Sequence, residues 1–365
     1  MKILHITSEL DGGGVDRLLF DYYNELKGLL QFDFVVTSYK EGMLEKPLMD
    51  GGCNVFHISP FRKSLKKHKD ELKAILNCGD YDVIHDHSGY KAAINLKLAK
   101  QNGIKVRIAH SHQANVKQNF FEKIRRFFFT KMTMHYSTSL VACGKDAAIW
   151  MWGRKKFESG EVSLIPNAIL TSKFLFSNSI RESIRNELHI ENRIVLGNVA
   201  RFSKQKNHLF LIEMFNYIHK RDDKYCLILV GHGELFQQTK DIVKQLGLEK
   251  DVVFLGVRND VDKLLNAFDV FVLPSLFEGL PVSMVEVQTN GLPAVVSDNV
   301  TSEIYINNNV FHLPLEKGAK VWSEFICNNK EICRTQSPDI LSSYYNIKIA
   351  SLFLKEFYEN KINKG

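Results

Sequence analysis

Short apolar runs alternate with longer amphipathic segments along the whole chain. Apolar runs of about four to eight residues between turn residues are typical of strands buried in a parallel sheet, with helices in the connections. We therefore predict strands at Lys2–Ile6, Phe32–Thr37, Asn54–Ile58, Val83–Asp86, Val106–Ala109, Ser139–Cys143 and Val162–Ile165, and a second series at Ile194–Val199, Cys226–Val230, Val252–Phe254, Val270–Leu273 and Ala294–Ser297.

The two strand series predict two α/β domains, because 365 residues exceed what one ordinary core accommodates. The segment Ile165-Pro166-Asn167-Ala168 ends the first series, and a polar stretch leads into the second. We expect domains at residues 1–167 and 168–345. The helical pattern that continues through 346–365 either packs on its own domain or crosses back to the first.

Composition narrows the class of protein. No apolar run approaches the ~20 residues of a membrane helix, and acidic residues at Glu9 and Asp11 interrupt the N-terminal run, which we interpret as a strand and not as a signal peptide. The six cysteines form no CxxC pair, so we predict reduced thiols, no zinc site and a cytoplasmic location.

The net charge of +7 is placed unevenly. Residues 1–167 hold 25 Lys and Arg against 18 Asp and Glu, whereas the remaining residues hold 23 of each. The first half is therefore predicted to meet an anionic partner, and an anionic substrate, a lipid surface and nucleic acid are the alternatives. No nucleic-acid-binding motif is visible, which disfavours the last.

Two groups of residues stand at predicted strand ends in the first half. Gly12-Gly13-Gly14 lies between the first strand and a helix, where glycines admit a close ligand and a helix N-terminus favours an anion. A tight structural turn explains these glycines equally well. The histidine pairs His85 and His87, and His110 and His112, follow apolar strands, where substrate contact, metal binding or a structural role would each be consistent.

Two further groups stand in the second half. Arg201 and Lys206 flank a turn after the strand Ile194–Val199, and two cations beside a helix N-terminus suit a diphosphate. After Val270–Leu273 come Glu278, in a loop with glycine and proline, and Glu286, among apolar residues of the next helix. A carboxylate in such surroundings needs hydrogen-bond partners, and sugar or ribose hydroxyls are natural ones.

Together these elements resemble the GT-B glycosyltransferases, specifically their retaining group 1, or family 4, branch. The resemblance covers nearly the whole chain. It includes the glycine loop, Pro166-Asn167-Ala168, Arg201 with Lys206, Gly231-His232-Gly233, and the pair Glu278 and Glu286 at E-x7-E spacing. The opening Gly12–Arg17 and Ala109-His110-Ser111-His112 are similar to enzymes of bacterial capsule and exopolysaccharide assembly. Leu170 departs from the acidic residue usual at its position.

The resemblance implies two Rossmann-like domains with parallel sheets facing an active-site cleft. The N-terminal domain would bind a saccharide or lipid-linked acceptor, and the C-terminal domain a nucleoside-diphosphate sugar, with a UDP-sugar favoured. His110 matches the active-site histidine and His112 is the second choice. The implied acceptor side is Gly13, His87 and His112, and the implied donor site is Gly14, Arg201, Lys206, Gly231, Val257, Arg258, Glu278, Gly279, Leu280, Pro281 and Glu286.

The implied reaction needs no cofactor. Breaking a sugar–phosphate bond leaves negative charge on the diphosphate, which Arg201, Lys206 and a helix N-terminus can stabilise. We find no Asp-x-Asp motif near a strand end in the catalytic region, so we predict a metal-independent enzyme. The alternatives are a GT-B nucleotide-sugar epimerase, a catalytically inactive sugar-nucleotide-binding protein and a glycoside hydrolase with two carboxylates.

A basic, aromatic segment lies at residues 117–131. It holds Phe120, Phe121, Phe127, Phe128 and Phe129 among lysines and arginines. Such a helix suits a membrane interface, with apolar groups in lipid and basic groups at phosphates. We therefore expect peripheral binding to an anionic membrane surface, while an ordinary buried helix is the alternative.

Overall fold

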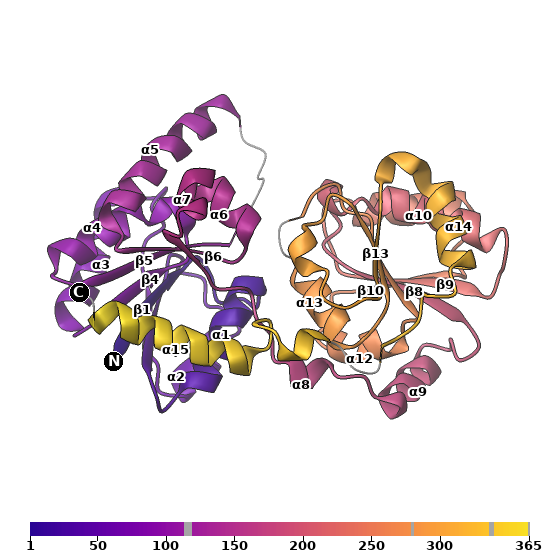
Figure 1. Ribbon diagram of the computed structural model, residues 1–365, viewed down its shortest axis with the longest axis horizontal. Coiled ribbons are helices and arrows are strands. Elements are labelled where there is room, and N and C mark those ends of the chain that lie inside the picture. The colour runs from indigo at the N-terminus through magenta and orange to yellow at the C-terminus, as the bar shows by residue number, and fades with distance from the viewer. Residues whose placement is uncertain (113–118, 279–280, 336–338, 364–365) are drawn as a thin grey trace. The chain divides into compact units, whose positions relative to one another are not determined.

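The computed structural model describes residues 1–112, 119–278, 281–335 and 339–363, and the chain divides into two compact units (Figure 1). The first unit comprises Met1–Ile169 and Tyr344–Gly365, and the second comprises Leu170–Ser343. Each unit is built on one parallel sheet. The predicted α/β class with two parallel-sheet domains is therefore confirmed.

The sheet of the first unit has the strand order β3-β2-β1-β4-β5-β6-β7, and all its pairs are parallel. Its strands are β1 (Lys2–Thr7), β2 (Gln31–Val36), β3 (Val55–His57), β4 (Val83–Asp86), β5 (Val106–Ser111), β6 (Ser139–Ala142) and β7 (Val162–Leu164). Its helices are α1 (Gly14–Leu26), α2 (Glu45–Asp50), α3 (Leu65–Cys78), η1 (Gly89–Ala92), α4 (Ala93–Gln101), α5 (Phe120–Tyr136), α6 (Lys145–Trp152), α7 (Arg154–Glu158) and α15 (Ile347–Asn363).

Helices cover both faces of this sheet, as a parallel sheet requires. Helices α3, α4 and α6 contribute Leu72, Leu96 and Ala148 to one apolar layer with strand residues such as Ile84. On the opposite face, α15 lies along α1 (Figure 1). The C-terminal helix therefore packs within the first unit.

The sheet of the second unit has the order β10-β9-β8-β11-β12-β13, again with parallel pairs throughout. Its strands are β8 (Ile194–Val199), β9 (Tyr225–Val230), β10 (Val252–Gly256), β11 (Val270–Leu273), β12 (Ala294–Ser297) and β13 (Val310–Leu313). Its helices are α8 (Thr171–Phe174), α9 (Asn178–Glu187), η2 (Lys204–Lys206), α10 (His208–His219), α11 (Phe236–Gln245), α12 (Val261–Ala267), α13 (Val282–Thr289), η3 (Ser302–Ile304), η4 (Leu315–Lys317), α14 (Gly318–Asn328) and η5 (Asp339–Ser342).

Two features differ from the sequence prediction. The strand β13 was not predicted, because an edge strand of four residues that is only partly buried leaves a weak apolar signal. The strand β5 runs on through His110 and Ser111, so His110 lies inside the sheet and not beyond its end. His85 likewise lies within β4, and only His87 and His112 follow their strands.

Candidate active site

In the second unit, two loops meet at the carboxyl ends of β8 and β11. The strand order reverses between these neighbouring strands, and ligands of open α/β sheets bind at such a point. The backbone N–H of Leu276 donates to the carbonyl of Gln205 at 2.8 Å. The side chain of Asn207 donates to the carbonyl of Pro274 at 3.1 Å. Backbone and side-chain contacts thus hold the two loops together.

Lys206 and Glu278 form an ion pair across these loops. Both side chains are largely buried, with 17% and 8% of their surfaces exposed. The Gln205 amide donates to the other oxygen of Glu278 at 3.1 Å and to the Phe277 carbonyl at 3.0 Å. The structure therefore brings together a predicted phosphate-binding cation and a predicted sugar-binding carboxylate.

Arg201 lies in the same loop as Lys206 but in a different environment. Its side chain is 76% exposed, and its guanidinium is 3.4 Å from the carboxylate of Glu234, which is also exposed. An exposed pair of this kind constrains the side chain weakly. Arg201 can therefore turn toward an anionic ligand at little cost.

The glycines of Gly231-His232-Gly233 allow the loop after β9 to lie against the loop after β8. A Cβ atom at Gly231 would stand 2.1 Å from the carbonyl oxygen of Ala200, and one at Gly233 would stand 2.4 Å from that of Phe202. The backbone N–H of Phe202 donates to the His232 carbonyl at 3.1 Å. Gly231 thus supports the position of the loop that carries Arg201.

Helix α13 begins at Val282, with Pro281 as its N-cap in extended conformation. No side chain of the described residues caps this helix start, so its backbone donors can meet an anion. Glu286 lies within α13 and is half-buried. The predicted contacts Gly279 and Leu280 lie outside the described residues.

The predicted base-contact residues lie after β10. Val257 is 75% exposed. Arg258 donates to Asp260 through two nitrogens, at 2.8 and 2.7 Å, and these hydrogen bonds raise its pKa above the ordinary range. The prediction that no Asp-x-Asp motif lies here is wrong, because Asp260-Val261-Asp262 follows β10. Asp260 is paired with Arg258, and Asp262 lies 3.5 Å from Lys173. Both carboxylates are therefore balanced by cations of the protein.

In the first unit, five histidines gather where β1, β4 and β5 run side by side. His5 of β1 is paired in register with His85 of β4, and His110 lies on β5. Residues two apart on a strand point to the same face, so His87 and His112 extend the same group. His5, His85 and His110 are almost wholly buried.

These histidines form two hydrogen-bonded chains. In the first, Nδ1 of His5 lies 3.0 Å from Nε2 of His87, whose Nδ1 lies 2.9 Å from Nε2 of His112; the Nδ1 atom of His112 lies 3.2 Å from Oδ1 of Asn167. In the second, Nδ1 of His85 lies 2.7 Å from the Tyr358 hydroxyl, and its Nε2 lies 3.2 Å from Nδ1 of His110. Each histidine belongs to one chain.

Burial keeps all five imidazoles neutral at pH 7. It lowers the pKa of His5 to about 3 and that of His112 to about 4. The pKa values of His85, His87 and His110 fall well below the ordinary value, because burial is reinforced by repulsion from neighbouring imidazoles. A neutral imidazole offers one donor and one acceptor, which is what each position in such a chain requires.

Two groups of three histidines come close enough to hold a metal ion. The ligand atoms of His5, His85 and His87, and those of His87, His110 and His112, lie within 4.8 Å of one another. Most ring nitrogens of these histidines are engaged in the two chains, whereas Nε2 of His5 and Nε2 of His110 make no hydrogen bond with the described residues.

The glycine loop stands at the N-terminus of α1. Gly13 is the N-cap, Gly14 is the first helical residue, and Gly12 has a φ of +92°, which favours glycine. The carboxylate of Asp16 accepts from the N–H groups of Asp11 and Gly13 at 3.2 and 3.1 Å. Burial raises the pKa of Asp16 to about 6. An anion at this loop must therefore use donors other than those two.

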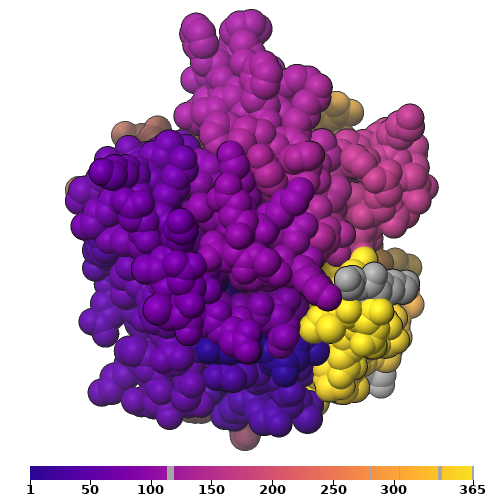
Figure 2. Space-filling model, turned by 90° about the vertical axis from the view of Figure 1, so that its left-hand side faces the viewer, coloured from indigo at the N-terminus to yellow at the C-terminus, as the bar shows by residue number. Residues whose placement is uncertain are grey.

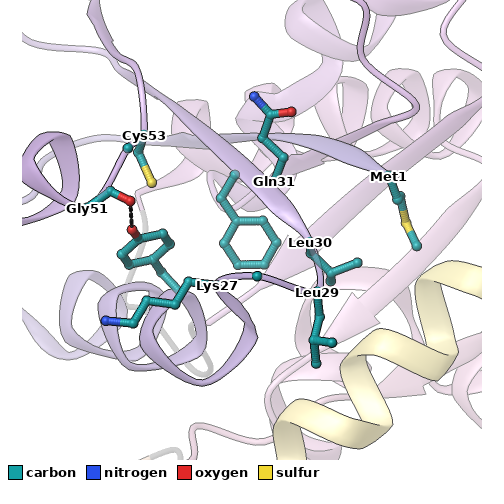
Figure 3. A pocket seen from close by; sticks show the side chains of 11 residues that line it. Met1, Lys27, Leu29, Leu30, Gln31, Gly51 and Cys53 are labelled. Carbon is teal, nitrogen blue, oxygen red and sulfur yellow. Dashed lines mark hydrogen bonds between the residues drawn. The ribbon is translucent and has the colours of Figure 1, made fainter.

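A cavity of about 470 Å³ opens at the end of the first sheet where the strands begin. Figure 3 shows Met1, Lys27, Gln31 and Cys53 around it, with the Tyr23 hydroxyl donating to the carbonyl of Gly51. It lies beside the starts of β1 and β2, not beside the carboxyl ends where ligands of such sheets bind. We therefore do not assign it to the active site.

Sequence reasoning missed several residues of these groups. Gln205 lies in the turn between Arg201 and Lys206 but carries no charge, and His5 lies in a predicted strand that contains no second histidine. Asn167 was noted only as part of a segment at the domain boundary. Tyr358 lies in the C-terminal helix, far along the chain from His85, so no local signal connects the two.

Comparisons with known proteins identify related chains. The profile of the family described as Glycosyl transferases group 1 matches residues 179–319. The putative glycosyltransferase EpsF of Bacillus subtilis is 30% identical over 332 residues, which are 89% of this chain and 86% of that one. An Escherichia coli UDP-Gal:alpha-D-GlcNAc-diphosphoundecaprenol alpha-1,3-galactosyltransferase is 27% identical, with 82% and 79% covered.

Two further similarities extend over essentially the whole chain. The capsular polysaccharide biosynthesis glycosyltransferase CapH of Staphylococcus aureus is 25% identical over 99% of each chain. The crystal structure of Anabaena HepE with UDP and glucose superposes with a TM-score of 0.78 at 18% identity, covering 100% of each chain. The last similarity shows the shared fold.

Proposed function

This chain belongs to the group 1 glycosyltransferases, and on that premise we propose that it transfers a sugar, with retention of configuration, from a UDP-sugar to a saccharide or lipid-linked saccharide. The process would be surface-polysaccharide biosynthesis, in keeping with relatives such as CapH. The observation that carries the proposal is the ion pair of Lys206 with Glu278 between the loops after β8 and β11.

The second unit is the proposed donor-binding domain. Lys206 and the mobile charge of Arg201 would hold the diphosphate, and the start of α13 would add backbone donors. These groups stabilise the negative charge that develops as the sugar–phosphate bond breaks. UDP is the proposed nucleotide because the structurally similar HepE was crystallised with it.

Two carboxylates would recognise hydroxyl groups. Lys206 and Gln205 hold the carboxylate of Glu278 in place. A carboxylate has about four lone pairs, and those that these two contacts leave unused would accept hydrogen bonds from a sugar. Glu286 in α13 would accept from the ribose hydroxyls. Without a ligand, the pair with Lys206 keeps the charge of Glu278 compensated, since an uncompensated buried carboxylate is costly.

The first unit is the proposed acceptor-binding domain. We assign His110 as the histidine of the reaction, with Gly13, Gly14, His87 and His112 on the same unit serving substrate binding. A lipid-linked acceptor is suggested by the E. coli relative, whose name specifies a diphosphoundecaprenol substrate.

The first unit also carries a surface suited to membrane phosphates. Helix α5 projects from the unit (Figure 2), and Thr133 is the one fully buried residue along its described length. Phe121 is 80% exposed and Phe128 60%, next to the exposed basic residues Lys123 and Arg125. No described helix of the chain is both long and apolar enough to cross a membrane. We propose peripheral binding to the anionic cytoplasmic face through α5.

The test of the function is release of free UDP from UDP-sugars, with and without saccharide acceptors. We expect acceptor-dependent release, and a product whose anomeric proton coupling matches that of the donor sugar. Release of UDP with isomerisation of the sugar alone would indicate an epimerase. Binding of UDP-sugar without turnover on any acceptor would indicate an inactive binding protein.

Metal independence is tested by chelation. Because two protein cations and a helix start face the leaving group in this proposal, activity should persist in excess EDTA. Complete loss that magnesium or manganese restores would contradict the proposal.

A further inference from the structure

Three buried groups from distant parts of the chain form one hydrogen-bonded chain. Tyr358 of α15 contacts His85 of β4, and His85 contacts His110 of β5. The ring of His85 stacks nearly parallel on that of His110, with an interplanar angle of 13°. All three side chains are at least 98% buried. Water therefore does not compete for these hydrogen bonds.

The direction of this chain follows from the chemistry of its members. A neutral imidazole donates through one nitrogen and accepts through the other. If the Tyr358 hydroxyl donates to Nδ1 of His85, then Nε2–H of His85 donates to Nδ1 of His110. The reverse direction would leave Nε2 of His110 as a bare acceptor.

The surroundings of His110 favour the first direction. Its Nε2 atom is buried and makes no hydrogen bond of normal geometry with the described residues. The backbone of Ile165 acts on this imidazole as an acceptor, because it raises the pKa of His110 against the effect of burial. A carbonyl facing a bare lone pair would be repulsive, whereas a carbonyl facing Nε2–H is not.

The Tyr358 hydroxyl is suited to act as a permanent donor. Burial raises its pKa well above the ordinary range, with a further contribution from Tyr22. The phenol therefore keeps its proton at neutral pH. Helix α15 thus contributes a neutral hydrogen-bond donor to its contact with the sheet, in addition to apolar side chains.

We propose that Tyr358 is a positioning residue, which fixes His85 and then His110 in the Nε2–H tautomer, so that the buried Nε2 atom of His110 carries a proton toward the Ile165 backbone and not a bare lone pair. The inference rests on the proposed role of His110 in the reaction. Tyr358 itself touches no reacting atom.

The direct test reads the tautomers by nitrogen-15 NMR of the histidine side chains. In the wild-type enzyme, we expect His85 and His110 to carry the proton on Nε2. In Tyr358→Phe, which keeps the ring and removes the O–H, both should shift toward a mixture of tautomers. His112, whose Nδ1 lies against Asn167, belongs to the other chain and should keep its signals.

Kinetics give the second readout. Tyr358→Phe should lower kcat by about 3- to 10-fold, the size expected for losing one hydrogen bond, with little change in the KM for UDP-sugar. The matched control is Tyr344→Phe, at an exposed tyrosine of the same C-terminal segment, which should leave kcat unchanged.

Three results would overturn the inference. The first is a wild-type His110 protonated on Nδ1, a result that needs no folded variant. The second is a Tyr358→Phe enzyme with unchanged tautomers. The third is a stoichiometric metal ion found by elemental analysis whose removal moves the signals of His87 and its neighbours, because the group would then be a metal site. The tautomers do not depend on turnover, so failure of the proposed function is a separate outcome.

Discussion

Lys206 and Arg201 belong to one loop and one proposed task, yet their surroundings give them different energetic roles. Lys206 is mostly buried against Glu278, whereas Arg201 is largely exposed. Truncating Lys206 leaves a buried carboxylate without its partner, but truncating Arg201 removes only a solvated pair. Truncation should therefore lower both stability and activity at Lys206, but only activity at Arg201.

For Arg201→Ala, we expect an unchanged melting temperature and a kcat lowered by about 10²-fold, as is typical when one group that stabilises a leaving group is lost. For Lys206→Met, kcat should fall similarly, and the free energy of unfolding should fall by about 1–3 kcal/mol. Thermal unfolding and UDP-release kinetics measure both. An Arg201→Ala enzyme with unchanged kcat would contradict the leaving-group assignment.

Substitutions at two glycines of the second unit can distinguish the cost of backbone strain from the cost of steric contact. Gly231 has a positive φ and meets the Ala200 carbonyl, whereas Gly247 has a positive φ with open space around it. Gly247→Ala should destabilise by about 1–2 kcal/mol, the strain of a left-handed residue. Gly231→Ala should cost about 1–3 kcal/mol more, because the added methyl group overlaps backbone.

Urea unfolding of both variants measures this difference, and the affinity for UDP shows its consequence. Only Gly231→Ala should weaken UDP binding, since only there does the displaced loop carry Arg201. Equal losses of stability in the two variants would mean that the loops after β8 and β9 separate without cost.

At the scale of elements, α5 differs from the other long helices of the first unit. Helices α1 and α3 bury several apolar side chains, whereas α5 exposes most of its phenylalanines and anchors through its C-terminal end. Phe129 packs edge-on against Phe61, at 6.0 Å between ring centroids. The alternative of an ordinary buried helix is therefore wrong for α5 within the first unit.

We predict that α5 binds anionic vesicles. Phe121→Glu with Phe128→Glu should remove most of this binding, because the variant places charges where apolar groups would enter lipid. Lys123→Glu with Arg125→Glu should weaken binding only to anionic vesicles, by about 1 kcal/mol or more for each basic group lost, and only at low salt. The matched control is Leu352→Glu, at an exposed apolar residue of α15.

Vesicle sedimentation at low and high salt measures these effects, with unfolding curves to show that the variants fold. If the wild-type protein binds neither anionic nor neutral vesicles at low salt, the membrane proposal fails. The glycosyltransferase assignment would be unaffected.

At the scale of the whole molecule, the two units should respond differently to acid. Five histidines of the first unit have pKa values lowered by burial, and among the described residues of the second unit His208, at about 4, is comparable. Below pH 6.5 the unfolded chain takes up protons that these native imidazoles do not. The free energy of unfolding therefore falls as pH falls, by about 1.4 kcal/mol per pH unit for each group.

Two buried carboxyl groups of the first unit oppose this loss. The pKa of Asp16 is raised to about 6 and that of Asp86 is raised as well, so their native forms take up protons more readily than the unfolded chain. The five histidines that destabilise the first unit in acid still outnumber these two carboxyl groups. Between pH 6.5 and about 4, the first unit should lose stability faster than the second.

Hydrogen exchange measured by mass spectrometry at pH 7.5 and 5.5, corrected for intrinsic rates, resolves the two units by peptide. Peptides of β4 and β5 should lose more protection than peptides of β8 and β11. Equal losses, or an earlier loss in the second unit, would mean that the histidines are protonated in the native state.

The sequence alone determined the architecture and much of the chemistry. Strands that are buried on both faces consist of continuous apolar residues. The predicted bounds of β4, β8, β11 and β12 therefore agree with the structure at every residue. The two loops of the proposed donor site were also recognisable, because Lys206 and Glu278 lie within a few residues of the ends of such runs. Strand ends, turns and charges are local properties, and local properties can be read along the chain.

Only the tertiary structure decided which side chains meet. Sheet order and register place His5 beside His85, and the packing of α15 places Tyr358 against His85. The pairing of Lys206 with Glu278 likewise depends on β8 and β11 being neighbours. A side-chain hydrogen bond requires separations near 3 Å between segments that are distant along the chain. Such separations are fixed by the packing of the whole unit, and no local pattern of residues specifies them.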